Sequence, residues 1–186
     1  MLKRIGLDFD VIPSRVEEGD FVQGESPRDH VLRLSEAKAV DVGSQHRNHW
    51  VIGADTVVYV EGTLLGKPES REEAVEMLGR LSGKEHWVLT GFSVNHDGKG
   101  KRAHEAVQTS VRVKSLTEAE IRWYVQTGEP FDKAGGYGIQ GIGSFMIESI
   151  RGSYTNVVGL PVCEVVQMLW GLGAITISES GIRVTE

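Results

Sequence analysis

The chain has 186 residues, of which 40% are hydrophobic and 25% are charged, a composition typical of a soluble globular protein. Its 20 Lys and Arg against 26 Asp and Glu give a net charge of −6, which argues against a nucleic-acid-binding protein or one that binds anionic membranes. A single cysteine, Cys163, excludes an intrachain disulfide, and no apolar stretch approaches the roughly 20 residues of a membrane span. We therefore expect a cytoplasmic protein.

Capping and turn signals divide the first half of the chain into elements. Ser26 followed by Pro27 and Asp29 is typical of a helix start, because serine caps the first turn and proline fits the first helical position. The predicted elements of this half are a short strand at Phe9–Ile12, a helix from Ser26 to about Val42, strands at Trp50–Val60 and Thr63–Leu65, and a helix from a capping box at Ser70–Glu73 to Gly83.

The second half continues the mixture of strands and helices. Its predicted elements are a hairpin of Trp87–Val94 and Ala106–Val113, a helix from a capping box at Thr117–Glu120 to about Thr127, a strand at Ser144–Ile150, and an apolar helix from Leu160 through Trp170. Trp123 and Tyr124 are expected in the core. The lack of strict alternation favours an α/β fold with a mixed, twisted sheet and flanking helices. We expect one domain over residues 1–174, followed by a tail, residues 175–186, that forms one more strand or is disordered.

Asp55 is a carboxylate inside the otherwise apolar strand Trp50–Val60. A buried carboxylate must be paired, bound to a metal, or raised in pKa. The alternative is an aspartate at a strand end or on an edge strand, where it faces water. Gly53 would allow another segment to approach closely, and together with Thr56 it favours a functional role.

Two lysines also lie in unusual positions. At 100° per residue, Lys38 falls near the centre of the apolar face of its helix, where lysine is uncommon. Its ammonium group could instead reach water, aided by the dipole at the helix C-terminus. Lys67 lies between Gly66 and Pro68, on a stiff turn just beyond the strand that contains Asp55. An exposed loop lysine usually has no role, but the fixed backbone and the nearby carboxylate favour ligand binding.

The segment Gly135–Gly143 contains five glycines in nine residues, with Gln140 among them. Its Gly136–Gly141 part matches the dinucleotide fingerprint in letters, but no strand precedes it and no helix follows it. What remains is a backbone that can approach a ligand closely and one amide side chain that both donates and accepts. Glu18, beside Glu17, is either part of a solvated acidic pair or an aid in holding a cation.

Together these segments resemble the Maf family of nucleotide pyrophosphatases. The matching blocks are Ser35–Ala39, Gly53–Val58, Gly66–Pro68, Asp132–Gly141 and Asn156–Pro161. The resemblance implies a fold like that of the inosine triphosphate pyrophosphatases, with two lobes around a cleft. It also implies hydrolysis of a nucleoside triphosphate to the monophosphate and pyrophosphate with a divalent cation, Mg²⁺ or Mn²⁺, and a homodimer.

The resemblance also implies roles for single residues. Asp55 matches the family's proposed proton acceptor, and Lys38 and Lys67 match its phosphate-contacting lysines. Glu18 matches an acid near the metal and the phosphates, so that Asp55 and Glu18 are the expected metal ligands. Thr56 and Gln140 match positions linked to base selection, and the sequence around Gln140 is similar to the branch that prefers dTTP and UTP. Asp55 could act as the base or as a metal ligand, and the residues alone leave both roles open.

One part of the family pattern is missing. The family opens with a strand and a Ser-x-Ser-Pro-Arg-Arg turn, and this chain has neither. Either the true start of the chain lies further upstream or the protein lacks this block, and the residues leave both alternatives open. Because paired arginines bind phosphate strongly, we expect their absence to lower activity by orders of magnitude. Two hypotheses follow: a dTTP/UTP pyrophosphatase, or a nucleotide-binding or cell-division regulatory protein whose chemistry is weak or lost.

Overall fold

The computed structural model describes residues 1–17, 21–22, 24–179 and 181–185. The chain forms two compact units whose segments alternate along the sequence. The first unit is Met1–Asp55, Thr90–Ala106 and Gly159–Glu186, and the second is Thr56–Leu89 and Val107–Val158. Along the chain, three strands pass from one unit to the other, and they are β1 (Val51–Val60), β3 (Glu85–His96) and β4 (Lys101–Val113).

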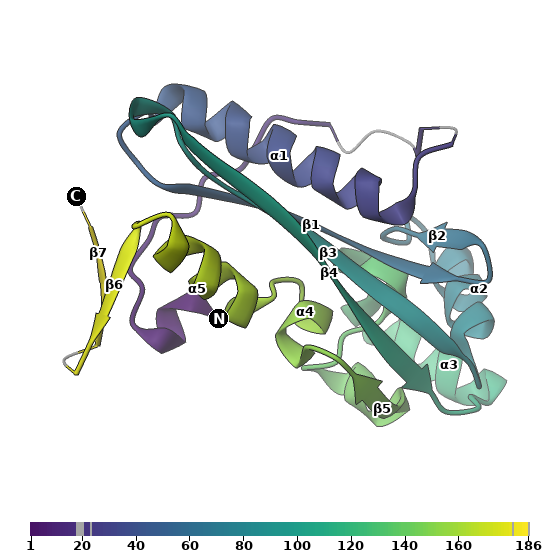
Figure 1. Cartoon of the computed structure of the whole chain (residues 1–186). Helices are drawn as coiled ribbons and strands as arrows, with labels where there is room; N and C mark the ends of the chain where they lie inside the picture. The colour runs from purple at the N-terminus through teal and green to yellow at the C-terminus, as the bar shows by residue number, and fades with distance from the viewer. Residues whose placement is uncertain (18–20, 23, 180, 186) are drawn as a thin grey trace. The chain divides into compact units, whose positions relative to one another are not determined.

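Five strands form one open sheet in the order β2-β1-β3-β4-β5, where β2 is Thr63–Leu65 and β5 is Ile147–Arg151 (Figure 1). The pairs β1–β2 and β4–β5 are antiparallel. A turn at Asp97–Lys99 joins β3 and β4 as a hairpin, and β1 and β3 run in opposite directions (Figure 1). The predicted α/β class with a sheet and flanking helices is confirmed, and the strand directions are antiparallel where a mixture was predicted.

The α-helices are α1 (Pro27–Gln45), α2 (Arg71–Leu81), α3 (Glu118–Gln126), α4 (Tyr154–Val158) and α5 (Val162–Gly171), with short 3₁₀ helices at Leu2–Ile5, Asp97–Lys99, Glu129–Asp132, Ala134–Gly136 and Ile142–Met146. Of these, α1, α2 and α3 begin directly after their predicted capping residues. Ser26 caps α1 by accepting a hydrogen bond from Asp29 N at 3.1 Å. No helix within the described ranges is long and apolar enough to cross a membrane.

The two predicted capping boxes differ in the structure. At α3 the box is complete, because Thr117 accepts from Glu120 N while the Glu120 carboxylate accepts from Thr117 N. At α2 only half of the box forms. Ser70 accepts from Glu73 N, but the Glu73 carboxylate accepts from Glu69 N, one residue before the cap.

Glycines let α1 lie directly on the sheet within the first unit. A Cβ atom at Gly53 of β1 would overlap the Ser35 carbonyl oxygen and lie 2.6 Å from Ala39 N. A Cβ atom at Gly91 of β3 would overlap the Val31 carbonyl in the same way. The helix backbone therefore contacts neighbouring strands at two places where any other side chain would force it away.

The second unit has its own hydrophobic core. Val58 and Leu65 of the sheet pack with Met77 and Leu78 of α2 and with Tyr124 of α3 in one buried cluster. The expectation that Tyr124 lies in the core is confirmed, since it is fully buried. The same expectation for its neighbour Trp123 is wrong, because 52% of that residue is exposed.

Three other parts of the chain also differ from the prediction or decide between its alternatives. Phe9–Ile12 forms no strand. Strand β4 begins at Lys101 and not at Ala106, because its first residues are polar and mostly exposed and so show no apolar alternation. Residues of the expected tail form an antiparallel hairpin of β6 (Ile175–Ser178) and β7 (Gly181–Val184). The predicted domain boundaries and the predicted cleft stay predictions.

Candidate active site

Asp55 and Lys38 meet in the first unit. Side chains alternate along a strand, so Asp55 is on the same face of β1 as Gly53, where α1 contacts the strand. Lys38 lies one helical turn beyond Ser35, which contacts Gly53. Its Nζ donates a hydrogen bond to Asp55 Oδ1 at 2.7 Å. The close packing of helix on strand thus aims the lysine at the carboxylate.

The two charged side chains are largely buried, since 17% of the Lys38 side chain and 7% of the Asp55 side chain are exposed. Of the alternatives for Asp55, the structure therefore shows a paired carboxylate and excludes one that faces water. The alternative for Lys38, an ammonium group extended into water, is excluded as well. A buried ion pair costs desolvation and is weak evidence for stability, so its presence favours a chemical role.

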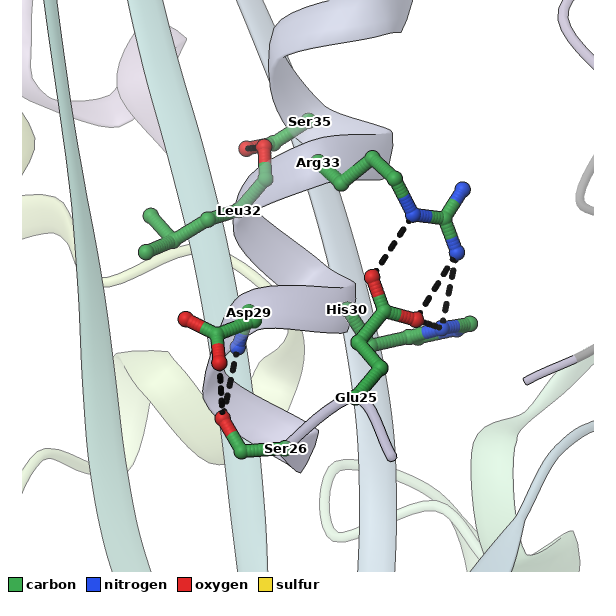
Figure 2. A network of polar contacts seen from close by, with 7 residues as sticks. All are labelled: Glu25, Ser26, Asp29, His30, Leu32, Arg33 and Ser35. Atoms are coloured by element: carbon green, nitrogen blue, oxygen red, sulfur yellow. Dashed lines mark hydrogen bonds and ion pairs between the residues drawn. The ribbon is translucent and has the colours of Figure 1, made fainter. Parts of the chain in front are cut away.

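A second charged network surrounds the start of α1, and sequence reasoning did not find it. Arg33 donates to both oxygens of Glu25, from Nε at 2.7 Å and from Nη2 at 3.0 Å, and His30 Nδ1 lies 3.0 Å from the same carboxylate. Figure 2 shows Arg33 and His30, both on α1, converging on Glu25, which lies just before the cap formed by Ser26. The hydrogen bonds from Arg33 are the main cause that lowers the pKa of Glu25 to about 2.

This network is also electrostatically coupled to the buried pair. The hydrogen bonds to Glu25 raise the pKa of Arg33, and the negative charge of Asp55 adds to this effect. Arg33 is therefore a further fixed cation in the field of Asp55. No sequence signal separated it from other surface arginines, because its partner precedes the helix and its role depends on how the chain enters α1.

In the second unit, the structure joins two of the predicted segments. Gly135 N donates to the Gly66 carbonyl oxygen at 2.8 Å, which ties the turn of Lys67 to the glycine-rich segment. Lys67 is exposed. The pKa of Asp132 is lowered mainly by the hydrogen bond from Lys133 Nζ at 2.6 Å, and the charge of Lys67 lowers it further. Lys67 thus lies in a polar neighbourhood at the edge of the glycine-rich segment.

The remaining predicted residues are placed as follows. Gln140 is exposed, at a turn in the glycine-rich segment, and Thr56 is half-buried and directly follows Asp55 in β1. Glu18 lies outside the described residues. The structure thus brings Lys38 to Asp55 in one unit and the Lys67 turn to the glycine-rich segment in the other.

Comparison with known proteins places these features in a family. The family profile described as Maf-like protein matches residues 1–172. The chain belongs to the Maf family. The predicted membership is confirmed, and the blocks that suggested it include both Lys38–Asp55 and the Gly66–Gly135 contact.

Several relatives of this Maf chain are named dTTP/UTP pyrophosphatase. The relative from Syntrophus aciditrophicus is 49% identical over 178 residues, which cover 96% of this chain and 86% of the relative. The relative from Syntrophotalea carbinolica is 48% identical over 182 residues, with 97% and 82% covered. That from Geotalea uraniireducens is 48% identical over 175 residues, with 94% and 90% covered.

The Maf family resemblance implies a divalent metal, and the side chains can be tested for it. Within the described ranges, no group of three or more His, Cys, Asp and Glu residues could hold a metal ion. Mg²⁺ is commonly bound by only one or two carboxylates together with substrate phosphates. Asp55, whose carboxylate oxygens could serve as ligands and which lies beside Lys38, fits such a shared site. It does not form a metal cage of its own.

Proposed function

We propose that this Maf protein is a nucleoside triphosphate pyrophosphatase that hydrolyses dTTP and UTP to the monophosphate and pyrophosphate. The observation that supports it most is the 49% identity, over 96% of the chain, to a relative named dTTP/UTP pyrophosphatase. The buried Lys38–Asp55 pair adds a physical reason, because it holds a carboxylate and a cation at a fixed distance of 2.7 Å.

In the proposed reaction, one water molecule is consumed and the α–β phosphoanhydride bond breaks. The oxygen of water bonds to the α-phosphorus, and pyrophosphate leaves, so that the nucleoside monophosphate remains. The attacking water loses a proton, which we assign to the carboxylate of Asp55 as general base. Lys38 donates to Oδ1 of that carboxylate and so fixes its orientation.

Binding a triphosphate needs local positive charge, because the substrate is strongly anionic and the chain has a net charge of −6. Lys38 and Lys67 are the lysines we assign to the phosphates. A divalent cation, Mg²⁺ or Mn²⁺, would be held by Asp55 and Glu18 with phosphate oxygens, and would neutralise the charge that develops on those oxygens.

Recognition of the base is assigned to Thr56 and Gln140. The Gln140 amide can donate to O4 and accept from N3–H of uracil or thymine. With the 2′ position of the sugar not contacted by these residues, dTTP and UTP would both be accepted. The family resemblance further supports a homodimer, which light scattering of the purified chain would test.

The decisive experiment is the release of pyrophosphate from UTP and dTTP with Mg²⁺ or Mn²⁺, for the wild-type chain and for Asp55→Asn. We expect Asp55→Asn to lower kcat by about 10²- to 10⁴-fold, the usual contribution of a general base. Asp8→Asn is the matched control, because Asp8 is exposed and its carboxylate accepts a hydrogen bond from the backbone N of its neighbour Phe9.

Turnover of 7-methyl-GTP or ITP without turnover of UTP would overturn the proposed substrate class. Binding of UTP without release of pyrophosphate would favour the second hypothesis, a nucleotide-binding regulatory protein.

A further inference from the structure

The glycine-rich segment of the second unit is closed into a loop, residues 138–143, and Gln140 lies at its tip. Ile139 and Gln140 form the turn, and a 3₁₀ helix begins at Ile142. Gly138 and Gly143 face each other at the base, because a Cβ atom at Gly143 would lie 2.7 Å from the Gly138 carbonyl oxygen. The loop therefore presents one polar side chain between two ends that lie close together.

Two side chains from outside the loop hold these ends. The Glu129 carboxylate accepts from Ile142 N at 2.8 Å, from Gly143 N at 3.0 Å and from the Tyr124 hydroxyl at 2.9 Å. The Tyr124 hydroxyl in turn accepts from Gly138 N at 3.0 Å. Both ends of the loop are thus held by one hydrogen-bonded pair, Glu129 and Tyr124.

The glycines of the loop make room for this pair. A Cβ atom at Gly141 would overlap the Glu129 carboxylate, and one at Gly143 would lie 2.7 Å from the Tyr124 hydroxyl. Tyr124 is fully buried. Burial tends to raise the pKa of Glu129, but the hydrogen bonds from Gly143, Ile142 and Tyr124 hold it below its usual range. The anchor is therefore an ionised carboxylate in a rigid setting at neutral pH.

We propose that Glu129 and Tyr124 are positioning residues that fix the loop of Gln140 and thereby set the selectivity for uracil and thymine over cytosine. This inference rests on the proposed function. Its physical reason is the symmetry of the amide. Turned by 180°, a glutamine exchanges donor and acceptor, and it then fits the N4–H₂ and N3 of cytosine as well as it fits uracil.

The amide alone therefore cannot discriminate between the two bases. Discrimination depends on where the loop holds Gln140 relative to the base and to the groups around it, and such recognition requires placement within about 0.5 Å. An anchor that releases either end of the loop would let the amide adapt to cytosine.

The test compares kcat/KM for UTP and for CTP in Glu129→Gln and in Tyr124→Phe. In Glu129→Gln the amide has one accepting oxygen in place of two, so the donors of Ile142 and Gly143 can no longer both be satisfied. Tyr124→Phe removes the acceptor of the buried Gly138 N. We expect the UTP:CTP ratio to fall at least about tenfold in each variant.

Two further measurements separate positioning from a general loss of structure. The inhibition constant of tripolyphosphate, which has no base, should stay within about twofold of the wild-type value. Amide hydrogen exchange at residues 138–143 should accelerate in both variants. The matched control is Glu118→Gln, since Glu118 is an exposed carboxylate of α3 that bonds to Arg122, and its UTP:CTP ratio should not change.

Each result decides a different point. An unchanged UTP:CTP ratio in a folded variant that retains pyrophosphatase activity would overturn the positioning role. Equal losses for UTP, CTP and tripolyphosphate binding would also overturn it, because they indicate general unfolding. If one variant fails to fold, the other decides. A wild-type chain that neither binds nor hydrolyses UTP would refute the proposed function itself, and the inference with it.

Discussion

Lys38 of α1 and Asp55 of β1 are two charged side chains that form a largely buried ion pair. Their ion pair has lost most of its hydration, with 17% and 7% of the two side chains exposed, and attraction between buried charges often fails to offset that loss. An apolar pair of similar volume would serve the fold at least as well. The presence of charges is best explained by the chemistry that we propose for them.

Substitutions at Lys38 and Asp55 should therefore affect the stability of the fold and its activity differently. Lys38→Met leaves the Asp55 carboxylate buried without its lysine and should lower the free energy of unfolding by about 3 kcal/mol. The double variant Lys38→Met/Asp55→Leu should recover most of that loss while remaining inactive. Urea unfolding measures the first effect and pyrophosphate release the second. A double variant less stable than Lys38→Met would contradict this account.

His86 is a second buried polar residue, in β3 of the second unit. It is fully buried, and its Nε2 shares a hydrogen bond of 2.7 Å with the Tyr137 hydroxyl, while Nδ1 has no hydrogen-bond partner among the described residues. Burial lowers the pKa of His86 to about 4 from its usual 6.5. Between these values the unfolded chain binds a proton that the folded chain does not.

Stability should consequently fall as the pH is lowered from 6.5 to 4. The shift corresponds to a loss of about 3 kcal/mol from His86 alone. Urea unfolding at pH 7, 5.5 and 4 should show this slope in the wild type and a much smaller slope in His86→Gln. His104→Gln, which changes an exposed histidine, serves as the control and should keep the wild-type slope. A slope that survives in His86→Gln would assign it to other groups.

At the scale of elements, the packing of α1 on β1 determines whether Lys38 reaches Asp55. Gly53 has no side chain, so Ser35 and Ala39 of the helix can contact the strand backbone. Lys38 lies on the same helix, next to Ala39, and Asp55 lies two residues beyond Gly53 in the strand. A displaced helix would therefore separate the pair without any change in its two residues.

Gly53→Ala tests this coupling. The new methyl group would lie 2.6 Å from Ala39 N, so the helix must move, and we expect a loss of about 3 kcal/mol in stability together with a loss of activity. Gly79→Ala is the contrasting control. Gly79 is exposed in α2 with nothing within 4 Å of its Cβ position, so alanine should stabilise the helix by up to about 1 kcal/mol. Thermal unfolding and pyrophosphate release distinguish the two, and full activity in Gly53→Ala would refute the coupling.

The elements also show which parts of the fold could be predicted from the sequence. Local sequence signals were sufficient to predict a helix start where the capping side chain accepts from the backbone N–H of the first turn, as at Ser26 and Thr117. They failed where tertiary contacts decide. The Glu73 carboxylate bonds to Glu69 N and leaves its box incomplete, and the polar first half of β4 is held as a strand by its neighbour β3 and not by an apolar pattern.

At the scale of the whole molecule, the same distinction applies to the candidate site. Lys38 and Asp55 could be found because a charge in an apolar pattern is visible in one segment. Glu129 could not, because its carboxylate bonds to backbone groups of a loop more than ten residues away. The crowding of glycines in that loop was visible in the sequence, but it gave no indication that a carboxylate outside the loop was its cause.

The acid sensitivity of the whole chain should arise from carboxylates in both units. Hydrogen bonds from Arg33 lower the pKa of Glu25, in the first unit, to about 2, and the hydrogen bond from Lys114 lowers that of Glu120, in the second unit, to about 2. The usual value is 4.5, so each ionised group stabilises the fold above about pH 4.5, and its contribution is lost as the pH falls towards 2.

Glu25→Gln and Glu120→Gln should each be less stable than the wild type at pH 5, and each difference should shrink as the pH approaches 2. Because the two carboxylates share no hydrogen-bond partner, their effects should add in the double variant. Urea midpoints at pH 5, 4 and 3 measure this, with Glu105→Gln on the exposed side of β4 as the control. A difference that stays constant with pH would mean that the two carboxylates stabilise the fold by packing and not by charge.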